Sequence, residues 1–475
     1  MRRAALFVVL ALLFCLAGVL LSLNGCGGGN TVSSLSKIQH VVVIFQENRT
    51  PDNLFQDPVL VKNGADIQNY GVNSTGQTIP LSPMDLGTVG SNPQNYDLSH
   101  AHAAFVSMYD NGKMDGADLI PYACAVGATN CPPANPQFKY VNPSDVQPYF
   151  QMAEQYTFAD RMFQTNEGPS FPAHQFIISG TSAPTATSNL FAAENMTNPG
   201  TAGCAAPRGQ LVALIDPTGN ESSSMYPCFE HPTLTDLLDA ANITWRYYAP
   251  SAGSIWTAPN AIQHMCGPNA TPPNATQCVG SDWTGTSPKV VLNQTQSNPQ
   301  ILSDIANGQM AQVSWVIPDG ADSDHASIND GCGPSWVTSI VNAIGNSQYW
   351  SNTAIVITWD DWGGWYDHVA PTVVSNGTSW GSGYVYGFRV PMIVISPYAK
   401  QAYVSHVPHD FGSILKFIES IFSLPSLGYA DAPADNLSDF FSFGQPATQF
   451  RAISPPPNDA TCKSDASPPT DPDDD

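Results

Sequence analysis

Four short apolar runs constrain the fold of this 475-residue chain more than any other feature. Each is an unbroken stretch rich in valine and isoleucine, without the alternation of apolar and polar residues that marks a half-exposed strand. They are HVVVIF (40–45), VSWVI (313–317), AIVIT (354–358) and VPMIVI (390–395). Amphipathic stretches at 234–241 and 411–422 supply covering helices. The pattern predicts an α/β fold, an open sandwich whose mostly parallel sheet is covered on both faces.

Polar residues follow three of these runs directly. The first leads into Gln46-Glu47-Asn48, the second into Pro318-Asp319 and the third into Trp359-Asp360-Asp361. Open parallel sheets bind ligands beyond the carboxyl ends of their strands. We therefore expect these segments, which are far apart in the sequence, to meet at one edge of the sheet.

The charge balance limits the partners of the chain. Its formal net charge is −23, with 16 Lys and Arg against 39 Asp and Glu. Such a chain has little to neutralise a nucleic-acid backbone, so we expect no nucleic-acid partner. Electrostatic docking on anionic lipid is disfavoured as well. An anionic phosphate ester would need local positive charge, which a bound metal ion provides.

The first 26 residues resemble an export signal. Arg2 and Arg3 precede an apolar run over residues 4–23, and Leu23-Asn24-Gly25-Cys26 resembles a bacterial lipobox. We expect cleavage, a lipid on Cys26 and a flexible tether over 27–35. The alternative is an uncleaved anchor, because the run is long enough to span a membrane. We expect the protein to be exported, either in secreted form or as a cell-envelope lipoprotein (periplasmic face or cell surface). Its only contact with the membrane would be the N-terminal lipid.

The rest of the chain is predicted to form one large domain over residues 36–450. Within it, 185–300 is rich in Asn, Pro and Cys and predicts a loop-rich insertion or lid, and the acidic, Pro-rich segment 451–475 predicts a disordered tail. Eight cysteines follow the export signal, and an even number in an exported chain favours disulfides. The simplest connectivity is Cys124–Cys131, Cys204–Cys228 and Cys266–Cys278, which leaves Cys332 with Cys462; the sequence leaves other pairings open.

Two of the strand-end segments carry the chemistry of metal ligands. Glu47 and Asn48 offer a carboxylate beside an amide oxygen. Asp360 and Asp361 are adjacent acids that repel each other unless a cation or a proton separates them. Each segment alone also fits a capped loop or a solvated turn. An oxygen-rich ligand set favours Ca²⁺, Mg²⁺ or Mn²⁺ over Zn²⁺.

A serine and several histidines are candidates for catalysis. Ser170 lies just ahead of an expected helix, whose positive end favours an alkoxide or a bound phosphate. The commoner role of such a serine is a plain N-cap. The histidines near the expected strand ends are His100, His102, His325 and His368. A phosphate leaving group needs a proton donor, although a single histidine is more often structural than catalytic.

Taken in order, these motifs resemble those of a known family. They are ENRT (47–50), HAH (100–102), GKMDG (112–116), GPSFP (168–172), SDH (323–325), WDDWGGWYDHVAP (359–371) and GFRVPMIVISPYA (387–399). The set resembles the bacterial phosphoesterase family that contains acid phosphatases and phospholipases C, over roughly residues 36–425. There are departures: many members have Glu at the position of Asp361, and many read Pro-Asn-Arg where this chain has Pro172-Ala173-His174.

The resemblance implies a three-layer, alkaline-phosphatase-like α/β/α core and metal-assisted hydrolysis of phosphate esters. By position, the metal ligands are Glu47, Asn48, Asp360 and Asp361, and Ser170 is the nucleophile. The positions that handle phosphate and transfer protons are His100, Asp324 and His325, with His102 and His368 matching less closely.

The expected function is therefore that of a metal-dependent hydrolase that works by double displacement through a phosphoseryl intermediate. An acid-phosphatase-type phosphomonoesterase is the first expectation, and the alternative is a phospholipase C-type phosphodiesterase, so that the partner is a small phosphate ester or a phospholipid. A non-catalytic surface-binding lipoprotein is the alternative from another class. A Ser-His-Asp esterase is disfavoured because the sequence lacks a G-x-S-x-G motif.

Overall fold

The structure is a computed structural model. It describes residues 35–470 apart from 89, 130, 199, 294–298 and 373–385. The predicted export signal, the lipobox and all but the last residue of the predicted tether lie outside the described residues. In the part of the chain that the structure describes, no helix combines the length and the apolar character needed to cross a bilayer.

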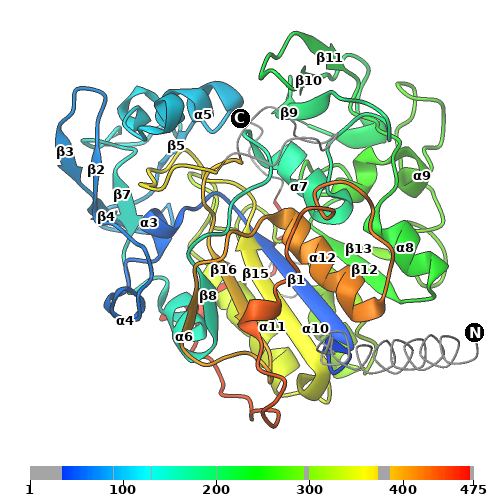
Figure 1. Cartoon of the computed structure of the whole chain (residues 1–475). Helices are drawn as coiled ribbons and strands as arrows, with labels where there is room; N and C mark the ends of the chain where they lie inside the picture. The colour runs from blue at the N-terminus through cyan, green and yellow to red at the C-terminus, as the bar shows by residue number, and fades with distance from the viewer. Residues whose placement is uncertain are drawn as a thin grey trace, which may run out of the picture.

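An eight-stranded sheet forms the centre of the molecule (Figure 1). In spatial order its strands are β13 (Val290–Leu292), β12 (Trp245–Ala249), β14 (Val313–Val316), β1 (His40–Gln46), β15 (Thr353–Trp359), β16 (Met392–Ile395), β8 (Thr157–Ala159) and β17 (Tyr403–Ser405). Every pairing is parallel except the two made by β16, which runs against both its neighbours. The four predicted strands are therefore present in a mostly parallel sheet.

Helices cover both faces of this sheet. On one face lie α7 (Ser170–Ser179), α8 (Leu234–Ala240) and α12 (Phe411–Phe422), and on the other lie α6 (Gln147–Gln155), α10 (Gln300–Ala306) and α11 (Gly333–Gly345). Phe45 of β1 packs edge-on against Phe411 of α12, which Figure 1 shows in front of the strands. Trp359 pairs with Gln46, the next residue along β1, and therefore points to the opposite face, where it packs against Tyr149 of α6. The predicted α/β/α sandwich is confirmed.

Smaller elements surround the sandwich. The additional helices are α3 (Pro51–Leu54), α4 (Pro58–Lys62), α5 (His102–Tyr109), α9 (Gln263–Cys266) and α13 (Asp459–Ser464). The additional strands are β2 (Tyr70–Val72), β3 (Thr78–Pro80), β4 (Ser82–Met84), β5 (Tyr96–Leu98), β6 (Tyr122–Cys124), β7 (Lys139–Val141), β9 (Phe191–Met196), β10 (Val212–Ile215) and β11 (Ser223–Met225). Short 3-10 turns are found at Asp110–Gly112, Ala117–Leu119, Gly203–Ala205, Ala258–Ala261, Trp350–Asn352 and Ser438–Phe440.

The region 185–300, predicted as a loop-rich insertion or lid, contains two kinds of structure. Strands β9, β10 and β11 form a separate three-stranded sheet, at the top of Figure 1, which is an addition to the core. Helix α8 and strands β12 and β13, in contrast, belong to the sandwich itself. The prediction was too broad because β12 reads WRYYA and β13 has three residues, so neither shows the long Val/Ile run of a central strand.

The cysteines pair as the simplest connectivity predicts, with bonds Cys124–Cys131, Cys204–Cys228, Cys266–Cys278 and Cys332–Cys462. The last of these bonds ties down the C-terminal segment. Where the sequence predicts a disordered tail from residue 451, the structure has helix α13. The backbone N–H of Thr470 also donates a hydrogen bond to Asp319 Oδ2, at 2.9 Å. A covalent link and bonds to the core offset the ordering entropy on which the expectation of disorder rested.

Candidate active site

The ends of two neighbouring parallel strands carry the centre of the site. Glu47 and Asn48 follow β1, and Asp360 and Asp361 follow β15, its partner in the sheet. The backbone N–H of Asn48 donates a hydrogen bond to Asp360 Oδ1 at 2.9 Å, so the two loops are in direct contact. All four side chains are completely buried. The structure thus brings the four predicted metal ligands together at one edge of the sheet.

Ser170 reaches the same place from a helix. It is the first residue of α7, and its hydroxyl Oγ donates a hydrogen bond to Asp361 Oδ2 at 3.3 Å. The following N–H, that of Phe171, is bonded to Asn195 Oδ1 at 2.9 Å, which fixes the start of the helix. The serine therefore lies at the positive end of a helix dipole and beside the carboxylates, where a nucleophile for a phosphate ester is needed.

Unusual backbone conformations allow the two loops to approach each other. Asn48 has a φ of 62°, in the left-handed region, and Gly363 has a φ of 61°. A Cβ atom on Gly363 would lie 2.6 Å from both the Cβ and the carbonyl oxygen of Asn48. The N–H of Gly363 donates to Asp361 Oδ1 at 2.7 Å. Glycine is required here because the backbone passes directly over Asn48 and its N–H orients Asp361.

The negative charges of this cluster favour the binding of a cation. Burial, and next the repulsion of Asp360, raises the pKa of Glu47 well above its ordinary value. The same two causes raise the pKa of Asp361. Although burial opposes it, the neighbouring carboxyl group of Glu47 lowers the pKa of Asp360. Glu47 and Asp361 therefore resist ionisation beside Asp360, and a divalent ion would favour the ionised form of all three acids.

Unsatisfied atoms in the cluster fit a metal ion. Glu47 Oε2, Asp360 Oδ2 and Asn48 Oδ1 are buried without a hydrogen-bond partner among the described residues. Buried polar atoms normally have partners, and orphans of this kind mark an ion or a water site. Glu47, Asp360 and His174 each present one ligand atom, and these three atoms lie within 4.8 Å of one another. The residues present therefore fit a divalent ion.

His174 was not among the predicted site residues. Its Nε2 lies 3.1 Å from Glu47 Oε1, both side chains are inaccessible to solvent, and burial lowers the pKa of His174 to about 4. The imidazole is therefore neutral at ordinary pH. The sequence feature that could have identified His174 is its spacing from Ser170. His174 is four residues after Ser170, and residues four apart share one face of a helix.

Two predicted histidines flank the serine and the carboxylates. His100 Nε2 lies 4.0 Å from Asp361 Oδ2, and the ring centroid of His100 is 5.8 Å from that of His325. Nδ1 of His100 lies 2.9 Å from the carbonyl of Leu98, and Nδ1 of His325 lies 2.8 Å from the carbonyl of Ala326. A carbonyl only accepts hydrogen bonds, so each Nδ1 carries a proton. Each Nε2 is the nitrogen that would gain or lose a proton when the imidazole titrates.

Asp324 precedes His325 but its carboxylate faces another way. Oδ2 accepts hydrogen bonds from Tyr149 Oη at 3.0 Å and from Trp359 Nε1 at 2.9 Å, on the α6 side of the sheet. Burial raises the pKa of Asp324 to about 6. Arg49, which sequence reasoning passed over, donates from Nε to the carbonyl of Asp324 at 2.9 Å. These bonds hold the loop that carries His325, and the structure does not bring the Asp324 carboxylate to the cluster.

His102 lies in a second group of acids. Its Nε2 is 3.1 Å from Glu167 Oε2 and its Nδ1 is 2.6 Å from Glu221 Oε1. Burial works against the charged form, but the hydrogen bonds that His102 donates to these two carboxylates raise the pKa of His102 to about 9. His102 is therefore a charged, doubly anchored side chain. Through Glu167 it contacts the loop that precedes Ser170.

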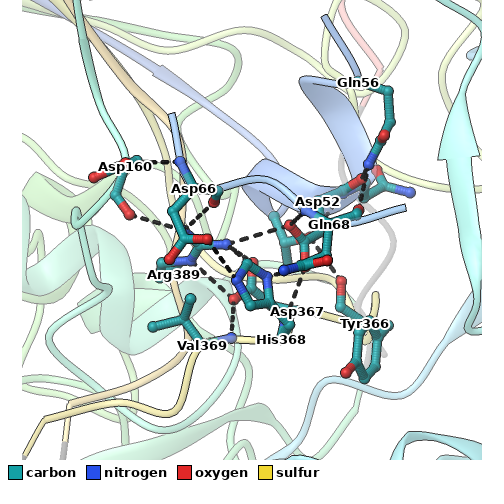
Figure 2. A network of polar contacts seen from close by, with 12 residues as sticks. Asp52, Gln56, Asp66, Gln68, Asp160, Tyr366, Asp367, His368, Val369 and Arg389 are labelled. Carbon is teal, nitrogen blue, oxygen red and sulfur yellow. Dashed lines mark hydrogen bonds and ion pairs between the residues drawn. The ribbon is translucent and has the colours of Figure 1, made fainter. Parts of the chain in front are cut away.

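His368 belongs to a third group, which Figure 2 shows. Its Nδ1 lies 2.7 Å from Asp52 Oδ2 and its Nε2 lies 2.9 Å from Asp66 Oδ1. Arg389 lies beside it and donates to both carboxylate oxygens of Asp367, at 2.8 and 2.9 Å. The ring nitrogens of His368 therefore contact Asp52 and Asp66, outside the carboxylate cluster, and Arg389 offsets part of the negative charge of this group.

The geometry thus places a serine hydroxyl beside buried carboxylates that fit a divalent ion, at the edge of an α/β/α sandwich. The profile of the Phosphoesterase family matches residues 38–425, and the chain belongs to that family. The predicted class, a phosphoesterase, is confirmed. With 82% of its length this chain matches 53% of the haemolytic phospholipase C of Pseudomonas aeruginosa, at 23% identity over 436 residues. It therefore spans about half the length of that relative.

Other relatives are matched over more of their length. Phospholipase C B of Mycobacterium tuberculosis is 23% identical over 497 residues, which cover 90% of this chain and 84% of that protein. The non-specific phospholipase C6 of Arabidopsis thaliana is 24% identical, over 86% of this chain and 72% of that protein. Among solved structures, a protein of the alkaline phosphatase superfamily from Vibrio parahaemolyticus is similar over 83% of this chain and 69% of that chain, with 10% identity and a TM-score of 0.33. The fold assignment above rests on the sheet order instead.

Proposed function

We propose that this protein is a metal-dependent phosphoesterase in which Ser170 attacks phosphorus and forms a phosphoseryl intermediate. One observation carries the proposal: Ser170 Oγ lies 3.3 Å from Asp361 Oδ2, at the start of α7 and beside a buried cluster of orphaned ligand atoms. A nucleophile, a helix dipole and a site for a cation therefore coincide.

The residues that would hold the metal are Glu47, Asn48, Asp360 and Asp361. A divalent ion bound there would neutralise the phosphate oxygens and favour the ionised form of the serine hydroxyl. The oxygen donors of these four residues, taken by themselves, suit Ca²⁺, Mg²⁺ or Mn²⁺.

The chain's own residues carry out the two displacements. Ser170 passes its proton to Asp361 Oδ2, which accepts its hydrogen bond, as the Oγ–P bond forms in line with the bond to the leaving oxygen. His100 or His325, protonated on both ring nitrogens, gives its Nε2 proton to that oxygen as the P–O bond breaks. The neutral histidine then takes a proton from the water that attacks the phosphoserine, and Asp361 returns its proton to Ser170 Oγ as the Oγ–P bond breaks. Asp361 orients Oγ throughout.

For the substrate we propose a phosphodiester of the phospholipid type. The support comes from the relatives, which are named phospholipases C in two bacteria and a plant. The second candidate, a phosphomonoester as for an acid phosphatase, is favoured by the burial of the nucleophile. Ser170 is only 1% exposed, which suits a small ester and requires covering segments to move for a lipid.

The test replaces Ser170 by alanine. Ser170→Ala is expected to reduce turnover of phosphate esters by about 10³-fold or more while metal binding and fold persist. Acid quenching of the wild type during turnover should leave one phosphoryl group on the peptide that contains Ser170, detected by mass spectrometry. Ser179→Ala is the matched control, because this serine lies at the other end of the same helix and bonds only to backbone carbonyls. Near-normal activity of Ser170→Ala would refute the covalent mechanism.

The same assay separates the substrates. Nitrophenyl phosphate, bis(nitrophenyl) phosphate and phosphatidylcholine vesicles are compared at equal enzyme concentration. The diester proposal expects faster turnover of the last two, and a preference for the monoester would replace it with the acid-phosphatase alternative.

We also propose that the N-terminal segment exports the enzyme and that Cys26 carries a lipid, which places the enzyme at the cell envelope. The support is the order of charged residues, apolar run and lipobox-like Leu23-Asn24-Gly25-Cys26. Metabolic labelling with a fatty acid tests this: a label on the wild type that persists in Cys26→Ser would contradict it.

A further inference from the structure

We infer that His174 is a direct ligand of the metal through Nε2, which makes the site a mixed nitrogen and oxygen site. The inference rests on the proposed metal-dependent function and adds a ligand, and a preference among metals, to it. His174 is four residues beyond Ser170 in α7, so one helix face presents both the nucleophile and the imidazole to the carboxylates.

The distances fit two ligands of one ion. His174 Nε2 and Glu47 Oε1 are 3.1 Å apart, and a carboxylate oxygen of Asp360 lies within 4.8 Å of both. Two atoms that each lie about 2.1 Å from an ion, at right angles to each other, are about 3.0 Å apart. The observed separation of Nε2 and Oε1 therefore fits adjacent positions in one coordination sphere.

The imidazole is held in this orientation from both sides. The ring of Phe45 meets it edge-on with centroids 4.8 Å apart, and the ring of Trp256 is stacked on it at 6.3 Å. All three side chains are completely buried. The packing therefore fixes the ring with one nitrogen aimed at the carboxylates, in an orientation that suits a ligand of an ion held by them.

A simpler role for His174 would be to donate one hydrogen bond to Glu47. That role would leave Glu47 Oε2, Asp360 Oδ2 and the side-chain oxygen of Asn48 buried without partners. Orphaned atoms from three residues around one imidazole are costly unless an ion satisfies them together. A metal bound by His174 and these oxygens satisfies the whole set.

A nitrogen ligand changes which metal the site prefers. Carboxylate and carbonyl oxygens suit Ca²⁺ and Mg²⁺, whereas imidazole favours ions further along the transition series. The nitrogen ligand therefore favours Co²⁺ or Zn²⁺ over Ca²⁺ and Mg²⁺, and it strengthens the binding of Mn²⁺ less than that of Zn²⁺. Zn²⁺ thus gains relative to the sequence-based preference, which counted oxygen ligands only and placed Ca²⁺, Mg²⁺ and Mn²⁺ first.

The test detects the nitrogen directly. The full chain is freed of metal, loaded with Mn²⁺ and examined by pulsed electron paramagnetic resonance, in which a coordinated imidazole gives a nitrogen modulation. The wild type should show this signal and His174→Gln should lack it. His231→Gln is the matched control, because His231 is also a buried histidine but bonds to the carbonyl of Ala183. His100 and His325 lie close by and could also give a nitrogen signal. Loss of the signal in His174→Gln, with the signal retained in His231→Gln, therefore identifies His174 as the ligand.

Calorimetric titrations give the second readout. His174→Gln should lower the affinity for Mn²⁺ and Zn²⁺ by about tenfold or more while the affinity for Ca²⁺ changes less, because glutamine replaces nitrogen by oxygen. A hydrogen-bonding histidine could also lower affinity, but it would lower it for Ca²⁺ equally and give no nitrogen signal. Thermal unfolding of the metal-free variants confirms that each is folded.

The two proposals fail in different ways. If wild-type protein binds Mn²⁺ without a nitrogen signal, or the signal persists in His174→Gln, the inference about His174 is wrong and the phosphoesterase mechanism stands. If thoroughly chelated wild type keeps full activity and binds no divalent ion, the metal-dependent function is wrong and the inference falls with it.

Discussion

The close approach of the two ligand loops can be tested at Gly363. This residue combines a φ of 61° with a position where an added Cβ would lie 2.6 Å from Asn48 Cβ and from its carbonyl oxygen. Replacement by alanine therefore has two costs: the left-handed conformation, and a clash with a residue of the proposed metal site. Gly76 is the matched control, because it has a φ of 77° and nothing within 4 Å of an added Cβ.

The two costs can be estimated separately. A left-handed alanine costs about 1–2 kcal/mol, and this is the whole effect expected for Gly76→Ala. Forcing a methyl group against packed backbone costs about 1–3 kcal/mol more, so Gly363→Ala should lose about 2–5 kcal/mol. The clash is relieved by moving Asn48 away from Gly363. Because Asn48 N–H also holds Asp360, this movement should weaken metal binding by about tenfold or more.

The free energy of unfolding is measured by urea titration of metal-free protein, and Mn²⁺ affinity by calorimetry. Gly363→Ala should be less stable than Gly76→Ala by about 1–3 kcal/mol, and only Gly363→Ala should lose metal affinity. Equal destabilisation of the two variants, together with unchanged Mn²⁺ affinity of Gly363→Ala, would show that the close approach does not organise the site.

Two further predictions concern stability. The bond Cys332–Cys462 spans 130 residues, so the double variant Cys332→Ser/Cys462→Ser should lose about 5 kcal/mol of unfolding free energy by loop-closure entropy; in urea titrations a loss below about 1 kcal/mol would contradict this. Hydrogen bonds to Glu167 and Glu221 raise the pKa of His102 to about 9, above its unfolded value of 6.5. The charged His102 therefore contributes stability below pH 6.5, and this contribution is lost as the pH rises through about 9. His102→Gln should therefore be less stable than wild type by about 2–3 kcal/mol at pH 6 and nearly equal at pH 9.5; a difference independent of pH would refute the charged pair.

The sheet and its reactive edge could be predicted from local patterns. A parallel strand buried on both faces must be apolar along its whole length, and the polar residues that follow it must lie at the rim. That is why residues 46–48 and 359–361 were expected to meet. The direction of β16 was not predictable, because an apolar run is equally buried in either orientation. Strand β12 could not be recognised in the sequence because it lies near the sheet edge and carries aromatic and polar residues instead of a Val/Ile run.

The histidines show where sequence reasoning ends. His100 and His325 lie beside the carboxylate cluster as expected, but His102 and His368 are bound by acids that no local motif reveals. Glu221 is 119 residues from His102, and Asp52 is 316 residues from His368. His174, in turn, reaches Glu47 because α7 crosses the end of β1, which is a property of packing. Chemistry that depends on contacts between distant segments requires the structure.

The charged group around His368 joins the two loops that carry Glu47, Asn48, Asp360 and Asp361. The loop after β1 continues from Asn48 into α3, which contains Asp52, and the loop after β15 continues from Asp361 to His368. Figure 2 shows the second meeting of these loops, where Asp52 accepts a hydrogen bond from the N–H of His368 at 2.9 Å. Arg389 pairs with Asp52 and Asp367 there. Each loop is therefore held twice, by strand pairing before the proposed metal ligands and by this charged group after them. These contacts at both ends oppose the mutual repulsion of the buried carboxylates.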